Sequence, residues 1–133
     1  MNTKQIGDLS VAAAIQEFIK LGKSVSIPFG DRDRYDLIVD DGGTLLKVQV
    51  KTGWKERNHI RFSAKSVTTK NGNWSHKTYK GQIDAFVVYY PPLNKLYKVP
   101  IDRCGSTGMN LQLQPTKNNQ KKKVHFASDF ELK

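Results

Sequence analysis

The segment 35–51, YDLIVDDGGTLLKVQVK, limits the possible folds of this chain more than any other stretch. Two runs rich in β-branched and aliphatic residues flank an Asp-Gly-Gly sequence at 41–43, and this pattern predicts a β-hairpin with a short turn. A turn at 42–43 sets Asp36 opposite Gln49, and a turn at 41–42 sets it opposite Lys47. The sequence leaves this choice of register open.

Both registers give the hairpin one apolar and one polar face, because side chains alternate between the two faces of a strand. Val48 and Val50 lie on the apolar face. The polar face carries a carboxylate, a carboxamide and two ammonium groups, from Asp36, Gln49, Lys47 and Lys51. Such a charged face is unusual for a strand pair near the middle of a small domain.

Length and charge narrow the class of protein. The 133 residues are most economically a single domain, 1–133, with one core. Lysine and arginine outnumber aspartate and glutamate by 22 to 12, and the net charge of +10 indicates a polyanionic partner, nucleic acid before an anionic membrane. No apolar run approaches the roughly 18 residues that span a bilayer. The absence of a secretory signal and the single cysteine suggest a cytoplasmic location.

The order of the predicted elements indicates an α/β domain. Apolar residues at three- and four-residue steps predict a helix over 8–21, capped by Asp8 or Ser10. Strands are predicted at 24–28, 59–64, 84–90, 96–99 and 111–114, and the near-continuous apolar run at 84–90 is typical of a strand covered on both faces. The polar segment 65–80, with Trp74 and Tyr79 interleaved, is expected to be a long exposed excursion.

Asp36, Gln49 and Lys51 together suit metal-assisted hydrolysis of a phosphodiester. Mg²⁺ prefers hard oxygen ligands, which Asp36 offers as a carboxylate and Gln49 as a weaker amide oxygen. Lys51 would orient the attacking water or offset negative charge that develops on the phosphate. A surface strand whose polar residues face solvent explains the same spacing, so spacing alone leaves both interpretations open.

The spacing Tyr35-Asp36, twelve residues, then Gln49-Val50-Lys51 resembles the motif of PD-(D/E)XK nucleases in a QxK form. Further blocks resemble the same group: KQIGDLSVAAAI, SIPFGDRDRYDLIVDDGG, VQVKTG, TYKGQIDAFVVY and PTKNNQKKKVHFASDFEL. This group of PD-(D/E)XK endonucleases includes a cyanobacterial group I intron homing endonuclease. The resemblance covers nearly the whole chain.

The resemblance implies a restriction-endonuclease-like α/β fold, with a central mixed β-sheet flanked by helices. It implies a site-specific DNA endonuclease that depends on Mg²⁺, with Mn²⁺ as a possible substitute. Asp36 would be a metal ligand, Gln49 would fill the second acidic position, and Lys51 would be the catalytic lysine. Archaeal Holliday-junction resolvases share the core, so branched DNA is a second candidate substrate beside double-stranded DNA. Cutting both strands of a duplex favours a symmetric homodimer or homotetramer.

Position 11 departs from the pattern of these nucleases. Their first helix carries a glutamate four residues after a glycine that corresponds to Gly7, and this chain has Val11 there. Valine cannot bind a metal ion, so a catalytically impaired protein that only binds DNA becomes the alternative function. Asp8, about 60° away around the helix axis, is the candidate replacement ligand. Packing in the core is the other explanation for a valine at this position.

Basic residues near the proposed centre are candidates for contacts with DNA phosphates, whose strength falls steeply with salt. The first group consists of Arg32, Arg34, Lys47, Lys55, Arg57 and Arg61. A second group in the segment 65–80, which includes Lys77 and Lys80, suits a loop or ribbon lying in a groove.

Overall fold

A computed structural model describes residues 1–70, 73–114 and 124–133, without the side chains of residues 67–77. Helix α1 spans Thr3–Lys20. Asn2 caps it, because the Asn2 side chain accepts from the Gln5 N–H and the Gln5 side chain accepts from the Asn2 N–H. The predicted cap at Asp8 or Ser10 is therefore wrong. Within the described residues, no helix has the length and apolarity needed to cross a membrane.

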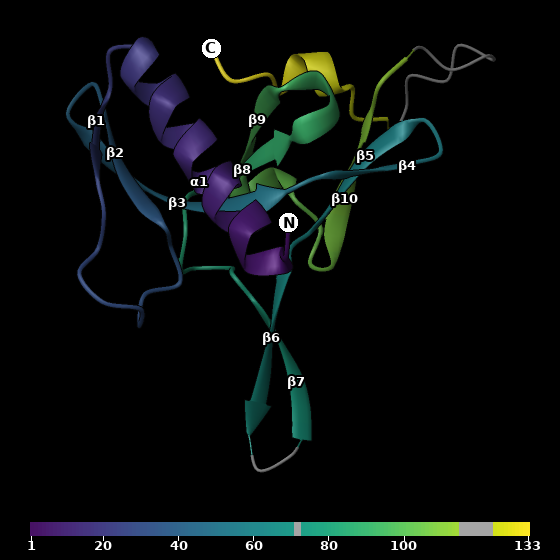
Figure 1. Cartoon of the computed structure of the whole chain (residues 1–133), viewed down its shortest axis with the longest axis horizontal. Coiled ribbons are helices and arrows are strands. Elements are labelled where there is room, and N and C mark those ends of the chain that lie inside the picture. Colours follow the sequence, from purple (N-terminus) through teal and green to yellow (C-terminus); the bar gives the residue numbers. More distant parts are fainter. Residues whose placement is uncertain (71–72, 115–123) are drawn as a thin grey trace.

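The first sheet has five strands in the order β1-β2-β3-β8-β9 (Figure 1). Their bounds are Ser24–Ser26, Leu37–Asp41, Thr44–Thr52, Ala85–Tyr90 and Lys95–Pro100, respectively. Strands β3 and β8 are parallel, and the other neighbours are antiparallel. The prediction of a central mixed sheet is thus confirmed.

The hairpin of β2 and β3 turns at Gly42-Gly43. Asp41 pairs with Thr44 and Leu37 pairs with Val48, which decides the register that the sequence left open. Both turn glycines have positive φ, 62° and 92°, a backbone region that glycine enters at little cost. Extending this pairing by one step sets Asp36 opposite Gln49.

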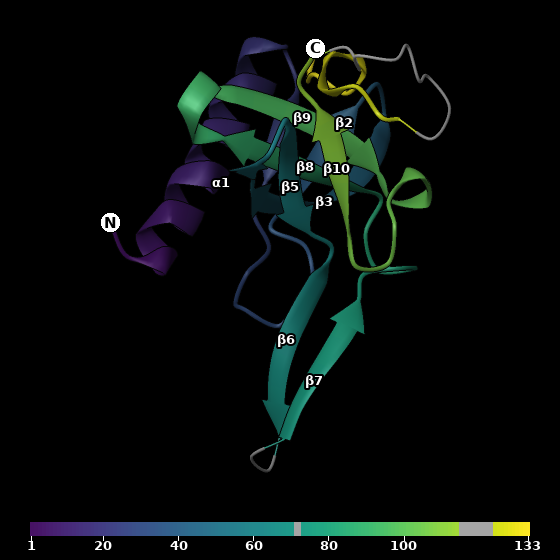
Figure 2. The same ribbon diagram turned by 90° about the vertical axis from the view of Figure 1, so that its right-hand side faces the viewer.

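Two smaller sheets complete the structure. The second has the order β10-β5-β4, and the third pairs β6 with β7. In the second sheet, β10 spans Gly108–Gln112, β5 spans His59–Ser63 and β4 spans Trp54–Glu56. In the third, β6 spans Lys65–Lys70 and β7 spans Asn73–Thr78. Short 3₁₀-helices occupy Pro91–Leu93, Ile101–Arg103 and Ala127–Asp129. The β6–β7 ribbon projects away from the rest of the structure (Figures 1 and 2).

The first sheet is covered on both faces. Ala14 and Phe18 of α1 pack on one face with Val48, Val50 and residues of neighbouring strands. The second sheet covers the opposite face, where its residues pack with alternate residues of β8 and β9. All six residues of β8 are buried, as the apolar run predicted. A sheet, and not a further helix, therefore provides the cover on the second face.

Gly53 carries the chain from the first sheet into the second, between the end of β3 and the start of β4. A Cβ atom at this position would lie 2.7 Å from Ile60 Cγ2 and 3.0 Å from Val88 Cγ1. These atoms belong to the core between the two sheets. Only a glycine lets the backbone lie this close to Ile60 and Val88. This close approach fixes the position where β3 ends, one residue after Lys51.

Candidate active site

Asp36 lies directly before β2, where β3 continues past the end of its neighbour. Its backbone N–H donates to the Val48 carbonyl at 2.8 Å, and its carboxylate Oδ2 accepts from the Val50 N–H at 3.0 Å. In a regular ladder, the Val50 N–H would donate to a backbone carbonyl of the neighbouring strand. Here the Asp36 carboxylate accepts this hydrogen bond instead. These two bonds fix Asp36 at the edge of β3.

The Asp36 carboxyl is part-buried, and this burial raises its pKa. The hydrogen bond from Val50 and the charge of Lys51 lower the pKa by smaller amounts. A pKa that is higher in the folded than in the unfolded chain means that the folded chain prefers the protonated form. An ionised Asp36 at neutral pH therefore costs stability, as is common for groups held for function.

Replacing Asp36 with asparagine is expected to raise the melting temperature at pH 7, because the amide oxygen still accepts from Val50 and carries no charge. The gain should vanish below the ordinary carboxyl pKa of 3.8 and develop fully as the pH rises past the raised pKa of the folded chain. Thermal melts between pH 3.5 and 7 would measure it. Asp31→Asn, an exposed change of equal charge, is the control, and an equal gain there would contradict the explanation.

Gln49 and Lys51 alternate with Val48 and Val50 along β3 and pair with Phe86 and Val88 of β8. Their side chains are half-buried and lie on the face that the second sheet covers. The Lys51 Nζ donates to Tyr79 Oη at 3.2 Å and to the Lys65 carbonyl at 3.3 Å. The Gln49 Nε2 lies 3.5 Å from the Val50 carbonyl oxygen, a long contact. The structure thus brings Asp36, Gln49 and Lys51 together on one side of β3.

The oxygen atoms of Asp36 and Gln49 at the edge of β3 suit a divalent metal ion whose remaining ligands come from water and a substrate. Among the described residues, no three histidine, cysteine, aspartate or glutamate side chains gather into a metal-binding group. Mg²⁺ is commonly held by one or two carboxylates, with water and substrate phosphates completing its shell. Asp36 and Gln49 provide one carboxylate and one amide oxygen for such a site.

Val11 and Asp8 lie on α1, on the other face of the sheet from Lys51. Val11 is partly buried and packs against the core under the helix. Its neighbour Ser10 forms a 2.6 Å hydrogen bond between Oγ and Thr52 Oγ1, which holds this turn of α1 against the end of β3. Asp8 is exposed. Val11 is therefore the sequence neighbour of Ser10, which contacts the end of β3, the strand that carries Lys51.

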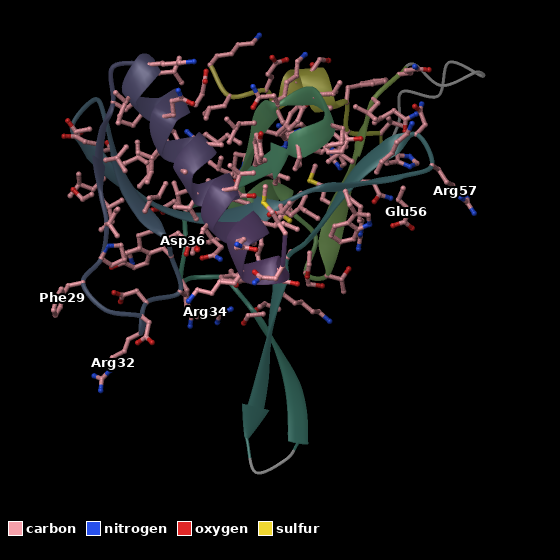
Figure 3. All side chains as sticks on the ribbon, viewed as in Figure 1. Phe29, Arg32, Arg34, Asp36, Glu56 and Arg57 are labelled. Carbon is pink, nitrogen blue, oxygen red and sulfur yellow. The ribbon has the colours of Figure 1, made fainter. Side chains whose placement is uncertain are left out.

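The basic candidates fall into separate places (Figure 3). Arg32 is exposed and points away from the body, whereas Arg34 donates to Gln82 Oε1 at 2.7 Å and to Ser66 Oγ at 2.9 Å. The Lys47 Nζ lies 5.9 Å from the centre of the Tyr35 ring.

The other basic candidates lie farther along the chain. Arg57 lies at the turn between β4 and β5, on the opposite side of the molecule from Asp36 (Figure 3). Lys55 and Arg61 belong to the same two strands. Lys80 is exposed after β7, and the side chain of Lys77 lies outside the described part.

Tyr79 is a residue of this site that the sequence pattern did not reveal. It lies at the end of the segment predicted to be exposed, yet only 4% of it is accessible. Its ring packs edge-on against Phe86, with 5.3 Å between ring centres, and the Arg34 guanidinium lies 4.0 Å from the ring centre. The prediction of exposure is wrong for this residue. The residues around Tyr79 in the sequence are polar, so the sequence gives no sign that this one ring is buried.

The family model described as PD-(D/E)XK endonuclease matches residues 1–133, the whole chain. The chain belongs to the PD-(D/E)XK endonuclease family. It is accordingly a DNA endonuclease, and nucleases of this family generally use divalent metal ions. The family prediction made from the hairpin and the flanking blocks is confirmed.

Among solved structures, this endonuclease is similar to the bacterial homing endonuclease I-Ssp6803I. The two share 32% sequence identity and a TM-score of 0.79, over 98% of this chain and 89% of the other. No curated protein matches the sequence. The family match and this structural similarity agree with the mixed sheet described above.

Proposed function

We propose that this PD-(D/E)XK endonuclease hydrolyses phosphodiester bonds of double-stranded DNA at a specific site, as a homodimer or homotetramer. Asp36 and Gln49 hold Mg²⁺, or Mn²⁺ in its place. The observation that carries the proposal is the hydrogen bond of the Asp36 carboxylate to the Val50 N–H, directly beside Lys51. This bond holds the carboxylate of Asp36, which precedes β2, against the stretch of β3 that carries Lys51. A bound metal ion would neutralise charge on the phosphate.

Lys51 contributes a positive charge near the scissile phosphate. Its ammonium is held by oxygen atoms at 3.2 and 3.3 Å and lies in a part-buried region, where electrostatic attraction is stronger than in water. A fixed cation stabilises the negative charge that builds up as water attacks. Asp36 is held equally firmly, so neither group needs to reorganise during the reaction.

The β6–β7 ribbon and the charge of the chain support DNA as the substrate. A two-stranded ribbon with six residues per strand is about 20 Å long, and such ribbons fit the major groove. The ribbon contains Lys65, Lys70 and Lys77, and the whole chain carries a net charge of +10. Arg32, in the loop before Asp36, and Lys47, on β3 two residues before Gln49, are exposed and add positive charge.

Val11 favours a second candidate, a protein that binds DNA on the same scaffold but cleaves it poorly. Its side chain packs in the core under α1 and supplies no ligand. The proposed pair of ligands, Asp36 and Gln49, then contains a single carboxylate, and Mg²⁺ binds weakly to so few anionic ligands.

A cleavage assay with a panel of substrates separates these functions. Supercoiled plasmid, a linear duplex containing the target site and a four-way junction would each be incubated with the native protein in Mg²⁺, Mn²⁺ or EDTA. Metal-dependent cutting of the duplex supports the proposal, and cutting confined to the junction supports a resolvase. Tight binding without any cutting supports the impaired protein. Light scattering decides between two and four copies of the 15.1 kDa chain.

Affinity for duplex DNA is expected to fall steeply with salt, because phosphate contacts release counterions. Arg32→Ala should weaken binding for all sequences and reduce the slope of log Kd against log salt by about 1, as expected for one lost phosphate contact. Fluorescence anisotropy at several salt concentrations measures this. Lys20→Ala, at the exposed end of α1, is the control. Equal slopes in native protein and Arg32→Ala would remove Arg32 from the DNA interface.

A further inference from the structure

The base of the β6–β7 ribbon holds Lys51 from two sides. The Lys51 Nζ donates to the carbonyl of Lys65, the first residue of β6, and to the hydroxyl of Tyr79, which directly follows β7. Lys65 pairs with Thr78 across the ribbon, so both acceptors belong to one joint. Figure 2 shows this joint where the ribbon leaves the body.

Tyr79 is itself firmly fixed. Its ring packs edge-on against Phe86, which is fully buried in β8. The Arg34 guanidinium lies 4.0 Å from the ring centre and also donates to Ser66 in β6 and to Gln82. The tyrosine is thus tied to the core on one side and, through Arg34, to the start of β6 on the other.

The contacts with Tyr79 restrict a side chain that is otherwise flexible. A lysine has a four-carbon stem and loses considerable rotamer freedom when it is fixed. Two oxygen acceptors bind the Lys51 ammonium, and the ring, 4.8 Å from Nζ to its centre, attracts the same charge. Without the tyrosine hydroxyl, one of these two acceptors is lost.

We propose that Tyr79 is a positioning residue for Lys51, and that it couples the seating of the ribbon in a DNA groove to the placement of Lys51 at the scissile phosphate. The inference rests on the proposed function, because it assigns Lys51 and the ribbon the roles given above. Tyr79 acts through Lys51. A ribbon that is displaced from the groove shifts both acceptors and so releases the ammonium.

Tyr79→Phe tests this because it removes the hydroxyl and keeps the ring. The single-turnover rate of cleavage is expected to fall about tenfold, while the Kd for DNA stays unchanged. The matched control is Tyr89→Phe, which removes a hydroxyl that donates to Asn94 Oδ1 at 2.9 Å on the helix side of the sheet. Both variants lose one hydrogen bond of a buried tyrosine, but only the first should lose rate.

A second measurement needs no cleavage. Proton–nitrogen correlation spectra of the lysine ammonium groups, recorded cold and at mildly acidic pH, detect ammonium protons that hydrogen bonds protect from exchange. The signal missing in Lys51→Ala assigns Lys51. It should be present in the native protein and in Tyr89→Phe, and weak or absent in Tyr79→Phe.

An unchanged Lys51 signal in Tyr79→Phe would overturn the inference, as would equal losses of rate in the two phenylalanine variants. Failure of the proposed function gives a different result. In that case neither the native protein nor Val11→Glu cuts any DNA with Mg²⁺ or Mn²⁺, and the Lys51 signal alone decides on the role of Tyr79.

Discussion

Lys51→Ala is expected to lower the single-turnover rate of DNA cleavage by about a hundred- to a thousandfold, the usual effect of removing one fixed group that stabilises developing charge. The charge of Lys51 is felt at the Asp36 carboxyl, whose pKa it lowers, and truncation to alanine removes this charge. Quenched-flow or gel assays under excess protein measure this rate directly. DNA affinity should change little, because a group that acts on the transition state contributes less to ground-state binding.

Lys47→Ala is the matched control for this prediction. Lys47 lies four residues before Lys51 on the same face of β3, is exposed and carries the same charge. Its loss should weaken DNA binding modestly and leave the rate at saturating protein unchanged. Equal loss of rate in both variants would mean that general positive charge, and not the placement of Lys51, drives the reaction.

Val11→Glu is expected to increase Mg²⁺ affinity about ten- to a hundredfold and to raise the cleavage rate at low Mg²⁺. A second carboxylate near a divalent cation adds an attraction of about 4 kcal/mol per unit charge at an intermediate dielectric, of which desolvation removes part. The hydrogen bond between Ser10 and Thr52 holds this turn of α1 against the end of β3, and we assume that a glutamate at position 11 extends from there to the metal. Titration calorimetry measures the affinity.

The thermal stability of the same variant gives an independent readout. A glutamate in place of a partly buried valine should lower the melting temperature without metal, and Mg²⁺ should restore it, because binding to the folded state alone stabilises that state. Val11→Gln matches the size without the charge and should show a smaller restoration than Val11→Glu. Equal metal dependence of Val11→Glu and Val11→Gln would place position 11 outside the metal site.

The hairpin was predictable because its signals are local. The glycine pair at 42–43 and the alternation along 44–52 determine which side chains share a face, whatever the tertiary surroundings. The placement of Asp36, Gln49 and Lys51 on one side of β3 therefore follows from the sequence. The burial of β8 follows as well, since a run of apolar residues needs cover on both faces.

Other features depend on interactions that no periodic pattern records. The first turn of α1 is polar and forms because Asn2 and Gln5 satisfy its free N–H groups, so apolar spacing places its start too late. Strand β4, WKE, is short and exposed, and pairing with β5 alone makes it a strand. The burial of Tyr79 depends on Phe86 and Arg34, which are distant in sequence. The packing of the second sheet on the first likewise depends on contacts between residues that are distant in sequence.

The separate pairing of β6 with β7 has a consequence for how target preference can change. Among the residues that the structure describes, the ribbon pairs with neither of the other two sheets, and the Lys65–Thr78 pair closes its base. Residues between these ends form an exchangeable cassette, because lengthening, shortening or grafting them leaves the register of β3 and β8 intact. Under the proposed function, a grafted ribbon that keeps the backbone at Lys65 and the ring of Tyr79 would redirect the enzyme to a new sequence while Lys51 stays in place.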